Sequence, residues 1–263
     1  MTLVPERTGL ASSQASASPW TIVRRAGKTG TGTFILFVSS IQHLGVFDFL
    51  TYNLGYVCLN HLEERYVLHP HTEVRRIDSE IGFGVFANAL IPKGTITWCR
   101  DELELSFSQE RLNKMTKFYQ DLVVHFCFRD AGGNYVLCWD FARYMNHSCD
   151  CNVTCIGTLC DIAKRDIKPG EQLTCDYSLH NLPDDFTCSC GAPQCRDVIR
   201  AADLPKLIPA IDAKVKDVVA IMSKVPQPVF EMMLPGDLKR VQDIIAGREK
   251  IPSAVENFRP LPP

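Results

Sequence analysis

The sequence lacks an excess of charge of either sign. Its 263 residues contain 28 Lys and Arg against 30 Asp and Glu, which gives a formal net charge of -2. A protein that binds nucleic acid over its surface usually carries a strongly basic face, and this composition gives no sign of one. Hydrophobic residues make up 46% and charged residues 22%, as in soluble globular domains of sufficient length to bury a core.

A secretory signal is also missing, because residues 1–20 contain no apolar stretch of the required kind. We therefore expect the twelve cysteines to be reduced rather than paired in disulfides. Their distribution is uneven, since eight of them lie between Cys149 and Cys195. This density indicates either metal binding or the packing of buried thiols.

Two N-terminal segments each allow more than one interpretation. Residues 1–32 are rich in Ser, Thr, Ala and Gly and hold a single acid, Glu6, which is typical of a disordered tail or of an organelle transit peptide. Residues 34–59 are apolar and long enough to span a bilayer, with Asp48 as the only acid. An acid at the centre of a span costs about 2.5–3.5 kcal/mol. We expect a buried strand or helix there, with a membrane segment as the alternative.

The remaining chain changes from short strands to helices. Gly and Pro turns separate strands that are predicted at residues 74–77, 81–87, 91–96 and 135–139. Ser106 and Gln109 have the spacing of a capping box, and apolar residues recur at helical spacing from Leu112 to Leu122. We expect one helix there, with this apolar stripe facing the core. After Cys195 the pattern predicts helices at about 201–225, 229–234 and 237–247.

Cys188, Cys190 and Cys195 lie within eight residues, with Gly and Pro between them. A tight turn of this composition directs thiolates toward a common centre. Zinc takes four nitrogen or sulfur ligands in a tetrahedron. The segment supplies three, so it predicts a zinc site whose fourth ligand comes from elsewhere, with a loop of reduced thiols as the alternative.

Two further segments carry polar side chains of ambiguous role. In residues 143–149, His147 and Cys149 suit metal ligation, Cys149 also suits a nucleophile, and a buried structural histidine is the default interpretation. In residues 165–177, a Pro-Gly turn separates two predicted strands. The segment ends at Tyr177, an aromatic residue that we expect to be half buried with its hydroxyl in a hydrogen bond.

The order of these segments is more specific than any one of them. Gly82-Phe83-Gly84 is followed by Arg143-Tyr144-Met145-Asn146-His147-Ser148-Cys149, then by Gly170-Glu171-Gln172-Leu173-Thr174-Cys175-Asp176-Tyr177, then by Cys-x-Cys-x4-Cys. With these motifs the chain resembles the SET-domain protein lysine methyltransferases that carry a post-SET zinc segment, of the compact free-standing type. The resemblance covers roughly residues 74–200.

The resemblance implies a fold that is mainly β with α additions. It implies small curled sheets with a pseudoknot, in which residues 143–149 and the segment near Tyr177 pass through one another, a zinc-bound post-SET loop and a C-terminal helical segment. The domain organisation that we predict is an N-terminal extension at 1–70, a SET domain at 71–180, a post-SET zinc segment at 181–200 and a C-terminal helical region at 201–263.

The resemblance also implies a function, the transfer of a methyl group from S-adenosylmethionine to the side-chain amine of a protein lysine. Tyr177 matches the catalytic tyrosine. The positions that match cofactor-binding residues are Gly82, Phe83, Gly84, Arg143, Asn146, His147 and Tyr177. The zinc ligands that the resemblance implies are Cys149, Cys188, Cys190 and Cys195. The alternative function is a catalytically silent, zinc-stabilised SET module that acts in protein interaction.

Two cysteines depart from the family pattern. Cys175 stands in the substrate pocket where many relatives carry an aromatic ring that limits methylation, which implies room for di- or trimethylation. Cys151 stands where relatives usually have Pro, and we expect a packed thiol there rather than a competing zinc ligand. We expect a monomer whose partner is a histone or another protein that presents a lysine. Neither direct nucleic acid binding nor a membrane is expected, and the location is intracellular, either cytoplasmic or nuclear, with organelle import left open.

Overall fold

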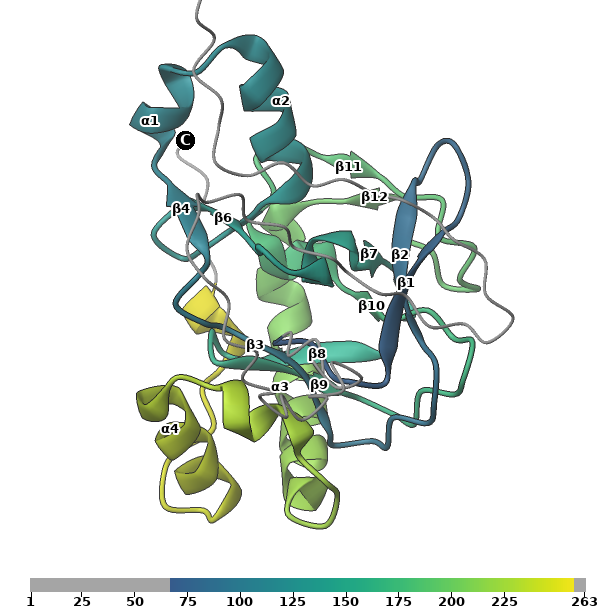
Figure 1. Ribbon diagram of the computed structural model, residues 1–263, viewed down its shortest axis with the longest axis vertical. Helices are drawn as coiled ribbons and strands as arrows, with labels where there is room; N and C mark the ends of the chain where they lie inside the picture. The colour runs from purple at the N-terminus through teal and green to yellow at the C-terminus, as the bar shows by residue number, and fades with distance from the viewer. Residues whose placement is uncertain (1–66, 258–263) are drawn as a thin grey trace, which may run out of the picture. The chain divides into compact units, whose positions relative to one another are not determined.

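The computed structural model describes residues 67–257 (Figure 1). These residues belong to a compact unit that runs from Cys58 to Pro263. The predictions for residues 1–32 and 34–59 lie outside the described residues. Between residues 67 and 257, no helix is both long enough and apolar enough to cross a membrane.

Five small sheets contain the strands of the described chain. The two three-stranded sheets have the order β3-β9-β8 (Ile96–Cys99, Cys160–Ala163, Val153–Ile156) and β4-β6-β5 (Leu105–Phe107, Tyr135–Leu137, Phe128–Arg129). The two-stranded sheets are β1-β2 (Thr72–Arg76, Phe83–Ala87), β7-β10 (Asn146–His147, Thr174–Cys175) and β11-β12 (Phe186–Thr187, Val198–Ile199). All pairs are antiparallel except β7-β10, which is parallel.

The α-helices are α1 (Gln109–Asn113), α2 (Lys117–Phe126), α3 (Leu204–Met222) and α4 (Pro235–Ile245). In Figure 1, α1 and α2 lie at the top of this unit and α4 at the bottom, and α3 runs from the middle toward the bottom behind the small sheets. The 3-10 helices are η1 (Phe141–Tyr144), η2 (Tyr177–His180), η3 (Ala201–Asp203), η4 (Pro228–Met232) and η5 (Ala254–Asn257). The predicted class, mainly β with α additions, is confirmed, as are the three C-terminal helices.

The largest core joins the β3-β9-β8 sheet to helices α3 and α4. Ile96 and Ile162 from the sheet and Val218 and Met222 from α3 are fully buried in it. Gln227 ties the same elements together, because its amide nitrogen donates to the Gly94 carbonyl (2.8 Å) and its amide oxygen accepts from the Ile96 N–H (2.9 Å). The C-terminal helices therefore complete the core of the central sheet.

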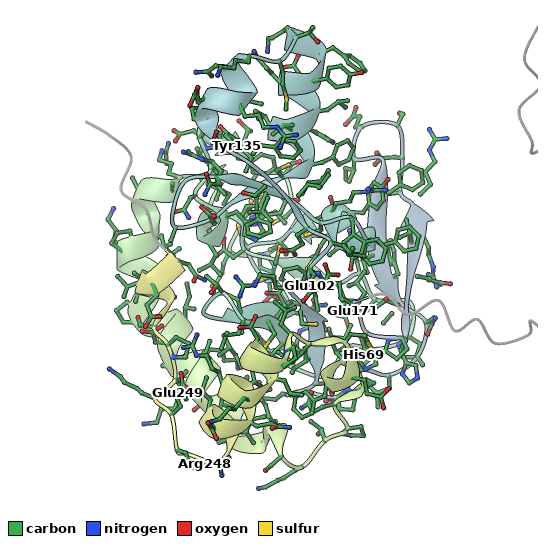
Figure 2. All side chains as sticks on the ribbon, turned by 60° about the vertical axis from the view of Figure 1, so that its left-hand side comes forward. His69, Glu102, Tyr135, Glu171, Arg248 and Glu249 are labelled. Carbon is green, nitrogen blue, oxygen red and sulfur yellow. The ribbon has the colours of Figure 1, made fainter. Side chains whose placement is uncertain are left out.

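The segment from Ser106 to Leu122 differs from its prediction as one core-facing helix. Ser106 lies in β4, and Ser108 caps the short helix α1 through its side chain. A break before α2 shifts the phase of the apolar stripe, so that Val123 is buried whereas Phe118 is 67% exposed. Figure 2 shows Tyr135 of β6 near this helix pair and Arg248, beyond α4, at the opposite end.

All eleven cysteines of the described chain are free thiols. Among the cysteines outside the candidate zinc ligands, Cys99, Cys138 and Cys160 are buried, Cys127 and Cys155 are partly buried, and Cys58 lies outside the described residues. Cys151 is also buried, where its sulfur accepts a hydrogen bond from the Lys164 ammonium (3.0 Å). These thiols belong to the packed interior, as we expected for Cys151.

Candidate active site

Strands β7 and β10 bring two distant segments together. Their parallel register pairs Asn146 with Thr174 and His147 with Cys175. Asn152 holds the same two segments, because its amide donates to the Gln172 carbonyl (2.8 Å) and accepts from the Thr174 N–H (2.9 Å). Its amide also reaches Glu171 at 3.2 Å, a residue that Figure 2 places in the middle of the molecule. Residues 143–149 and 170–177 thus meet as predicted.

Replacing Asn152 by Ala is expected to lower the free energy of unfolding by about 2–4 kcal/mol. The Asn152 side chain is 1% exposed, and its loss leaves backbone groups of β10 without partners inside the protein, at about 1–3 kcal/mol each. Urea unfolding followed by circular dichroism measures the change. Asn113→Ala on the exposed end of α1 is the matched control, and equal stability of the two variants would contradict the prediction.

Tyr177 begins η2 immediately after β10. Its hydroxyl donates to the Met145 carbonyl (3.0 Å), and its backbone N–H donates to Nδ1 of His147 (3.2 Å). The Tyr177 ring contacts the rings of His147, His180 and Phe186 at centroid distances of 5.4, 5.3 and 5.7 Å. Burial raises the pKa of the Tyr177 hydroxyl well above its ordinary value, so the group is a neutral phenol at physiological pH. The expected half-buried, hydrogen-bonded tyrosine is confirmed.

Asn146 connects β7 to the beginning of β2. Its side-chain amide donates to the Phe83 carbonyl (2.9 Å), which places the Gly82–Gly84 turn beside the Asn146 strand. Gly82 has φ +82, a conformation that favours glycine, and a Cβ there would meet open space. At Gly84 a Cβ would lie 2.5 Å from the Gln172 side-chain nitrogen. The absence of a Cβ at Gly84 therefore leaves room for the Gln172 side chain.

Arg143 lies in η1, three residues before Asn146. Its guanidinium stacks over the Tyr144 ring at 5.0 Å and donates to the Trp139 carbonyl at 3.4 Å. The Tyr144 ring in turn contacts the ring of Phe83 at 5.4 Å. Phe83 is 46% exposed. The Tyr144 ring therefore lies between the Arg143 guanidinium and the Phe83 ring and contacts both. Sequence reasoning did not single out Tyr144.

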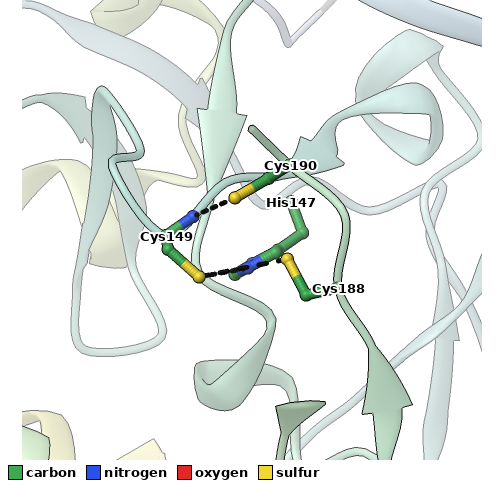
Figure 3. A group of neighbouring side chains, drawn as sticks. All are labelled: His147, Cys149, Cys188 and Cys190. Atoms are coloured by element: carbon green, nitrogen blue, oxygen red, sulfur yellow. Dashed lines mark hydrogen bonds between the residues drawn. The ribbon is translucent and has the colours of Figure 1, made fainter. Parts of the chain in front are cut away.

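A cluster of metal-ligand side chains lies beside this region (Figure 3). One donor atom from each of His147, Cys149, Cys188 and Cys190 lies within 4.8 Å of the others. The sulfur of Cys149 is 3.9 Å from that of Cys188, which is 3.7 Å from the sulfur of Cys195. Two sulfurs on a tetrahedral zinc, each about 2.3 Å from the ion, stand roughly 3.8 Å apart. The spacing of these sulfurs fits zinc.

The cysteine loop between β11 and β12 is held to Cys149 by backbone donors. The Cys149 N–H donates to the Cys190 sulfur (3.4 Å), and the Arg196 N–H donates to the Cys149 sulfur (3.3 Å). Burial opposes ionisation of Cys190, but N–H donors from Cys149 and Ala192 and the neighbouring thiols lower its pKa to about 6. Such donors stabilise thiolates, the form that binds metal.

Arg196 links the cysteine cluster to Tyr177. Its guanidinium reaches the Cys149 sulfur (3.5 Å) and the Asp176 carboxylate (2.6 Å), and Asp176 directly precedes Tyr177. Burial lowers the pKa of His147, the ring on the other side of this carboxylate, although Asp176 acts in the opposite direction. Sequence reasoning missed Arg196, whose only signal was its place directly after Cys195.

Cys175 lies buried beneath Tyr177. Its sulfur is 4.0 Å from the Asn146 carbonyl oxygen and 4.0 Å from Nε2 of His180. Burial raises its pKa well above the ordinary value, so the thiol is protonated. Cys175, Met145 and His180 line one side of a cavity of about 350 Å³. The cavity lies against the Met145 residue whose carbonyl accepts the Tyr177 hydroxyl.

Comparison with known proteins points to the SET domain, the family that the sequence motifs resemble. Residues 82–178 match the family model of the SET domain. The chain is 32% identical over 173 residues to histone-lysine N-methyltransferase ash1 of Drosophila melanogaster, which covers 61% of this chain and 8% of that protein. It is 28% identical over 172 residues to histone-lysine N-methyltransferase NSD3 of Mus musculus, covering 57% of this chain and 11% of the relative.

A shorter relative and one solved structure complete the comparison. Histone-lysine N-methyltransferase ASHH3 of Arabidopsis thaliana is 32% identical over 134 residues, covering 44% of this chain and 34% of that protein. The methyltransferase domain of human histone-lysine N-methyltransferase SETMAR is 24% identical with a TM-score of 0.38, covering 52% of this chain and 61% of that one. The chain thus spans about a third or less of the length of these three curated relatives.

Proposed function

We propose that the protein is an S-adenosylmethionine-dependent protein-lysine methyltransferase, because residues 82–178 match the family model of the SET domain. The observation that carries the proposal is the position of the Tyr177 hydroxyl, held 3.0 Å from the Met145 carbonyl where two motif segments pair. The printed names of the relatives refer to histone lysines, so histones are the first substrates to test. A histone substrate would place the protein in the nucleus.

The proposed cofactor site lies between the Gly82–Gly84 turn and Asn146. S-adenosylmethionine supplies a methyl group on a sulfonium that is already activated for transfer. The open space beside Gly82 and the exposed Phe83 ring suit a close backbone approach and stacking against a purine. Arg143 would bind the carboxylate end, and Asn146 and His147 would fix the adenine and amino-acid groups. These side chains align the donor, and they take no part in bond making.

Tyr177 would act on the lysine amine as a neutral hydrogen-bonding group. Free lysine has a pKa of about 10.4, so neutralising it at pH 7 costs about 4.6 kcal/mol. An apolar channel lowers that cost because burial disfavours the charged amine. The phenol stays protonated since burial raises its pKa. Its hydroxyl can therefore orient the amine toward the donor while the Met145 carbonyl orients the hydroxyl.

For the cysteine cluster we propose zinc bound by Cys149, Cys188, Cys190 and Cys195. The four donor atoms that lie within 4.8 Å of one another include His147 rather than Cys195, but the Nδ1 of His147 accepts the Tyr177 N–H at 3.2 Å. A neutral imidazole that accepts at Nδ1 carries its proton on Nε2, which faces the Cys149 sulfur at 3.4 Å. Nε2 is then a hydrogen-bond donor to the thiolate rather than a ligand. This supports Cys195 as the fourth ligand and leaves His147 to the cofactor site.

The proposed function is tested with purified full-length protein, S-adenosylmethionine labelled in the methyl group, and core histones. We expect label on protein, and mass spectrometry should place it on lysine side chains. Ribosomal proteins form a second basic substrate set for the non-histone case. Label on neither set, with folded protein and bound zinc, would instead favour a silent SET module.

Replacing Cys175 by Phe is expected to limit the product to monomethyl-lysine. The buried Cys175 thiol is smaller than the ring that many relatives carry, so the wild type should proceed to di- or trimethyl-lysine after exhaustive reaction. Mass spectrometry of the methylated peptide measures the distribution for both proteins. Cys99→Ser, at a buried thiol of β3 outside the cavity lining, controls for the loss of a cysteine. A wild type that stops at monomethyl-lysine would contradict the prediction.

A further inference from the structure

The cavity of about 350 Å³ beside Cys175 has a partly apolar lining that also includes three acids, Glu104, Asp130 and Asp161. Its apolar side chains include Trp98, Phe128 and Leu179. On strand β9, Cys160 and Ile162 are buried in the main core, and Cys160 also borders the cavity. Asp161 lies between them on the strand and lines the cavity. Because side chains alternate along a strand, the fold places this carboxylate on the cavity side.

Among residues 67–257, the Asp161 carboxylate has no partner. No hydrogen bond or ion pair of these residues involves this carboxylate. Asp161 is only partly accessible to solvent, because it lies in the lining of the cavity. An enclosed carboxylate without a hydrogen bond or counter-charge is unfavourable. Its cavity therefore suits a ligand that brings a positive charge.

Arg100 and Arg129 line the cavity, and the Arg129 Nε is buried without a hydrogen-bond partner, but no ion pair of the described residues joins either side chain to Asp161. Arg100 forms an ion pair with Asp237 at 2.9 Å. The Arg129 guanidinium stacks over the Tyr135 ring at 5.3 Å and donates to the Asn181 carbonyl. Neither bond reaches Asp161. The cavity is thus a partly apolar space in which Asp161 has no counter-charge from these two side chains.

The other titratable groups that face the cavity come from every element around it. They are Glu104, Asp130, His180 and the thiols of Cys138, Cys155, Cys160 and Cys175. Burial lowers the pKa of His180 to about 4 and raises the pKa of Cys155 to about 12, so both are neutral near pH 7. Burial, reinforced by Asp101, raises the pKa of Glu104 to about 8. Burial raises the pKa of Asp161 to about 7, so Asp161 ionises at a lower pH than Glu104.

We propose that Asp161 receives the side-chain ammonium of the target lysine and takes up its proton before methyl transfer. This inference rests on the proposed function, since it names the acidic group of the same substrate site. Lysine matches the cavity in two respects: its methylene stem suits the apolar lining and its ammonium suits the carboxylate. Cys175 and Met145 line the same cavity as Asp161, and the Met145 carbonyl accepts the Tyr177 hydroxyl at 3.0 Å.

The proton transfer conserves charge and electrons. An N–H bond of the ammonium breaks, an O–H bond forms on Asp161, and the electron pair stays on nitrogen as the lone pair that attacks the methyl group. Burial raises the pKa of Asp161 to about 7. This pKa is closer to the pKa of an amine than is the pKa of an ordinary carboxyl group, so Asp161 is a better proton acceptor. The proton leaves to solvent when the product dissociates.

The first test needs no turnover. Full-length protein is titrated at pH 8 with n-butylammonium, which has the stem and head of the lysine side chain, and with the uncharged n-butanol. We expect Asp161→Asn to weaken n-butylammonium binding at least tenfold and to leave n-butanol binding unchanged. Asp217→Asn on the exposed face of α3 is the matched control and should bind as the wild type. Equal n-butylammonium affinity of Asp161→Asn and wild type would overturn the proposal.

The second test separates the proton-accepting role from packing. The pH profile of kcat/KM is measured on core histones for the wild type and Asp161→Asn. We expect a deficit of at least tenfold at pH 7 that shrinks toward pH 9.5, because more free lysine is then neutral. A deficit that stays constant over this range would refute proton uptake by Asp161. Asp161→Leu, which matches the apolar lining, replaces the Asn variant if that variant lowers the thermal midpoint.

The two tests also separate this inference from the proposed function. If the wild type methylates no lysine, the proposed function fails, whereas n-butylammonium binding still decides whether Asp161 recognises a cation. If methyl transfer proceeds and Asp161→Asn is unaffected in both tests, Asp161 has no such role and the proposed function stands.

Discussion

Tyr177→Phe should lower kcat for methyl transfer by about 100-fold or more while the protein stays folded and keeps its zinc. Removing one positioned hydrogen-bond donor from an active site costs about 10²–10³ in rate. The hydroxyl of Tyr177 is held by the Met145 carbonyl at 3.0 Å, so its orientation is fixed before the substrate arrives. Phe retains the ring contacts with His147 and Phe186. The loss should therefore appear in kcat rather than in the dissociation constant of the cofactor.

Single-turnover kinetics with labelled cofactor and core histones measures this effect. Tyr119→Phe, which removes a hydroxyl from a residue that is 57% exposed on α2, is the matched control. We expect Tyr119→Phe to retain wild-type kcat. The thermal midpoint of Tyr177→Phe should fall slightly, since the Met145 carbonyl loses one hydrogen bond of about 1 kcal/mol. Equal methyl incorporation by Tyr177→Phe and wild type would remove the hydroxyl from the mechanism.

Cys188→Ser is expected to abolish zinc binding and, with it, methyl transfer. The Cys188 sulfur lies 3.9 Å from that of Cys149 and 3.7 Å from that of Cys195, so its loss removes the sulfur between the other two. Structural zinc contributes about 10–16 kcal/mol in small peptides. Strands β11 and β12 have only two residues each. Without the metal this loop should lose its fixed structure and release Arg196 from Asp176.

Elemental analysis of purified protein measures the zinc content, and labelled-cofactor transfer measures the activity. Cys151→Ser controls for the loss of a cysteine, because that thiol contacts Lys164 rather than the cluster. We expect Cys195→Ser to lose zinc as Cys188→Ser does. A variant at Cys195 that keeps full zinc would instead favour His147 as the fourth ligand. Active wild-type protein without zinc would contradict the whole assignment.

Local patterns explain which parts of the fold the sequence could predict. The C-terminal helices follow from apolar spacing and proline positions within each segment, so they were found near their true bounds. The helix at 106–122 was wrong because its break depends on local capping: Ser108 caps a helix of five residues and the chain restarts at Lys117. The spacing of apolar residues alone does not reveal such a change of phase.

Some residues of the candidate site could be predicted from the sequence and others could not. The motif residues Asn146, His147 and Tyr177 were identified because their order along the chain is specific, and the structure brings them together. Arg196 and Asn152 were missed because their roles depend on contacts with residues about 20 or more positions away. Asp161 was missed for another reason, since a single acid in a strand gives no sign of the cavity that it faces.

The shared core of the β3-β9-β8 sheet and α3 also affects how the chain is made. Synthesis completes the sheet at Ala163, but Met222, which covers it, follows about sixty residues later. At about 5–20 residues per second, the ribosome leaves that apolar face uncovered for roughly 3–12 s. Ile96 and Ile162 are then available to chaperones or to other nascent chains. Cellular yield should therefore respond to translation speed between β9 and α3 more than to speed elsewhere.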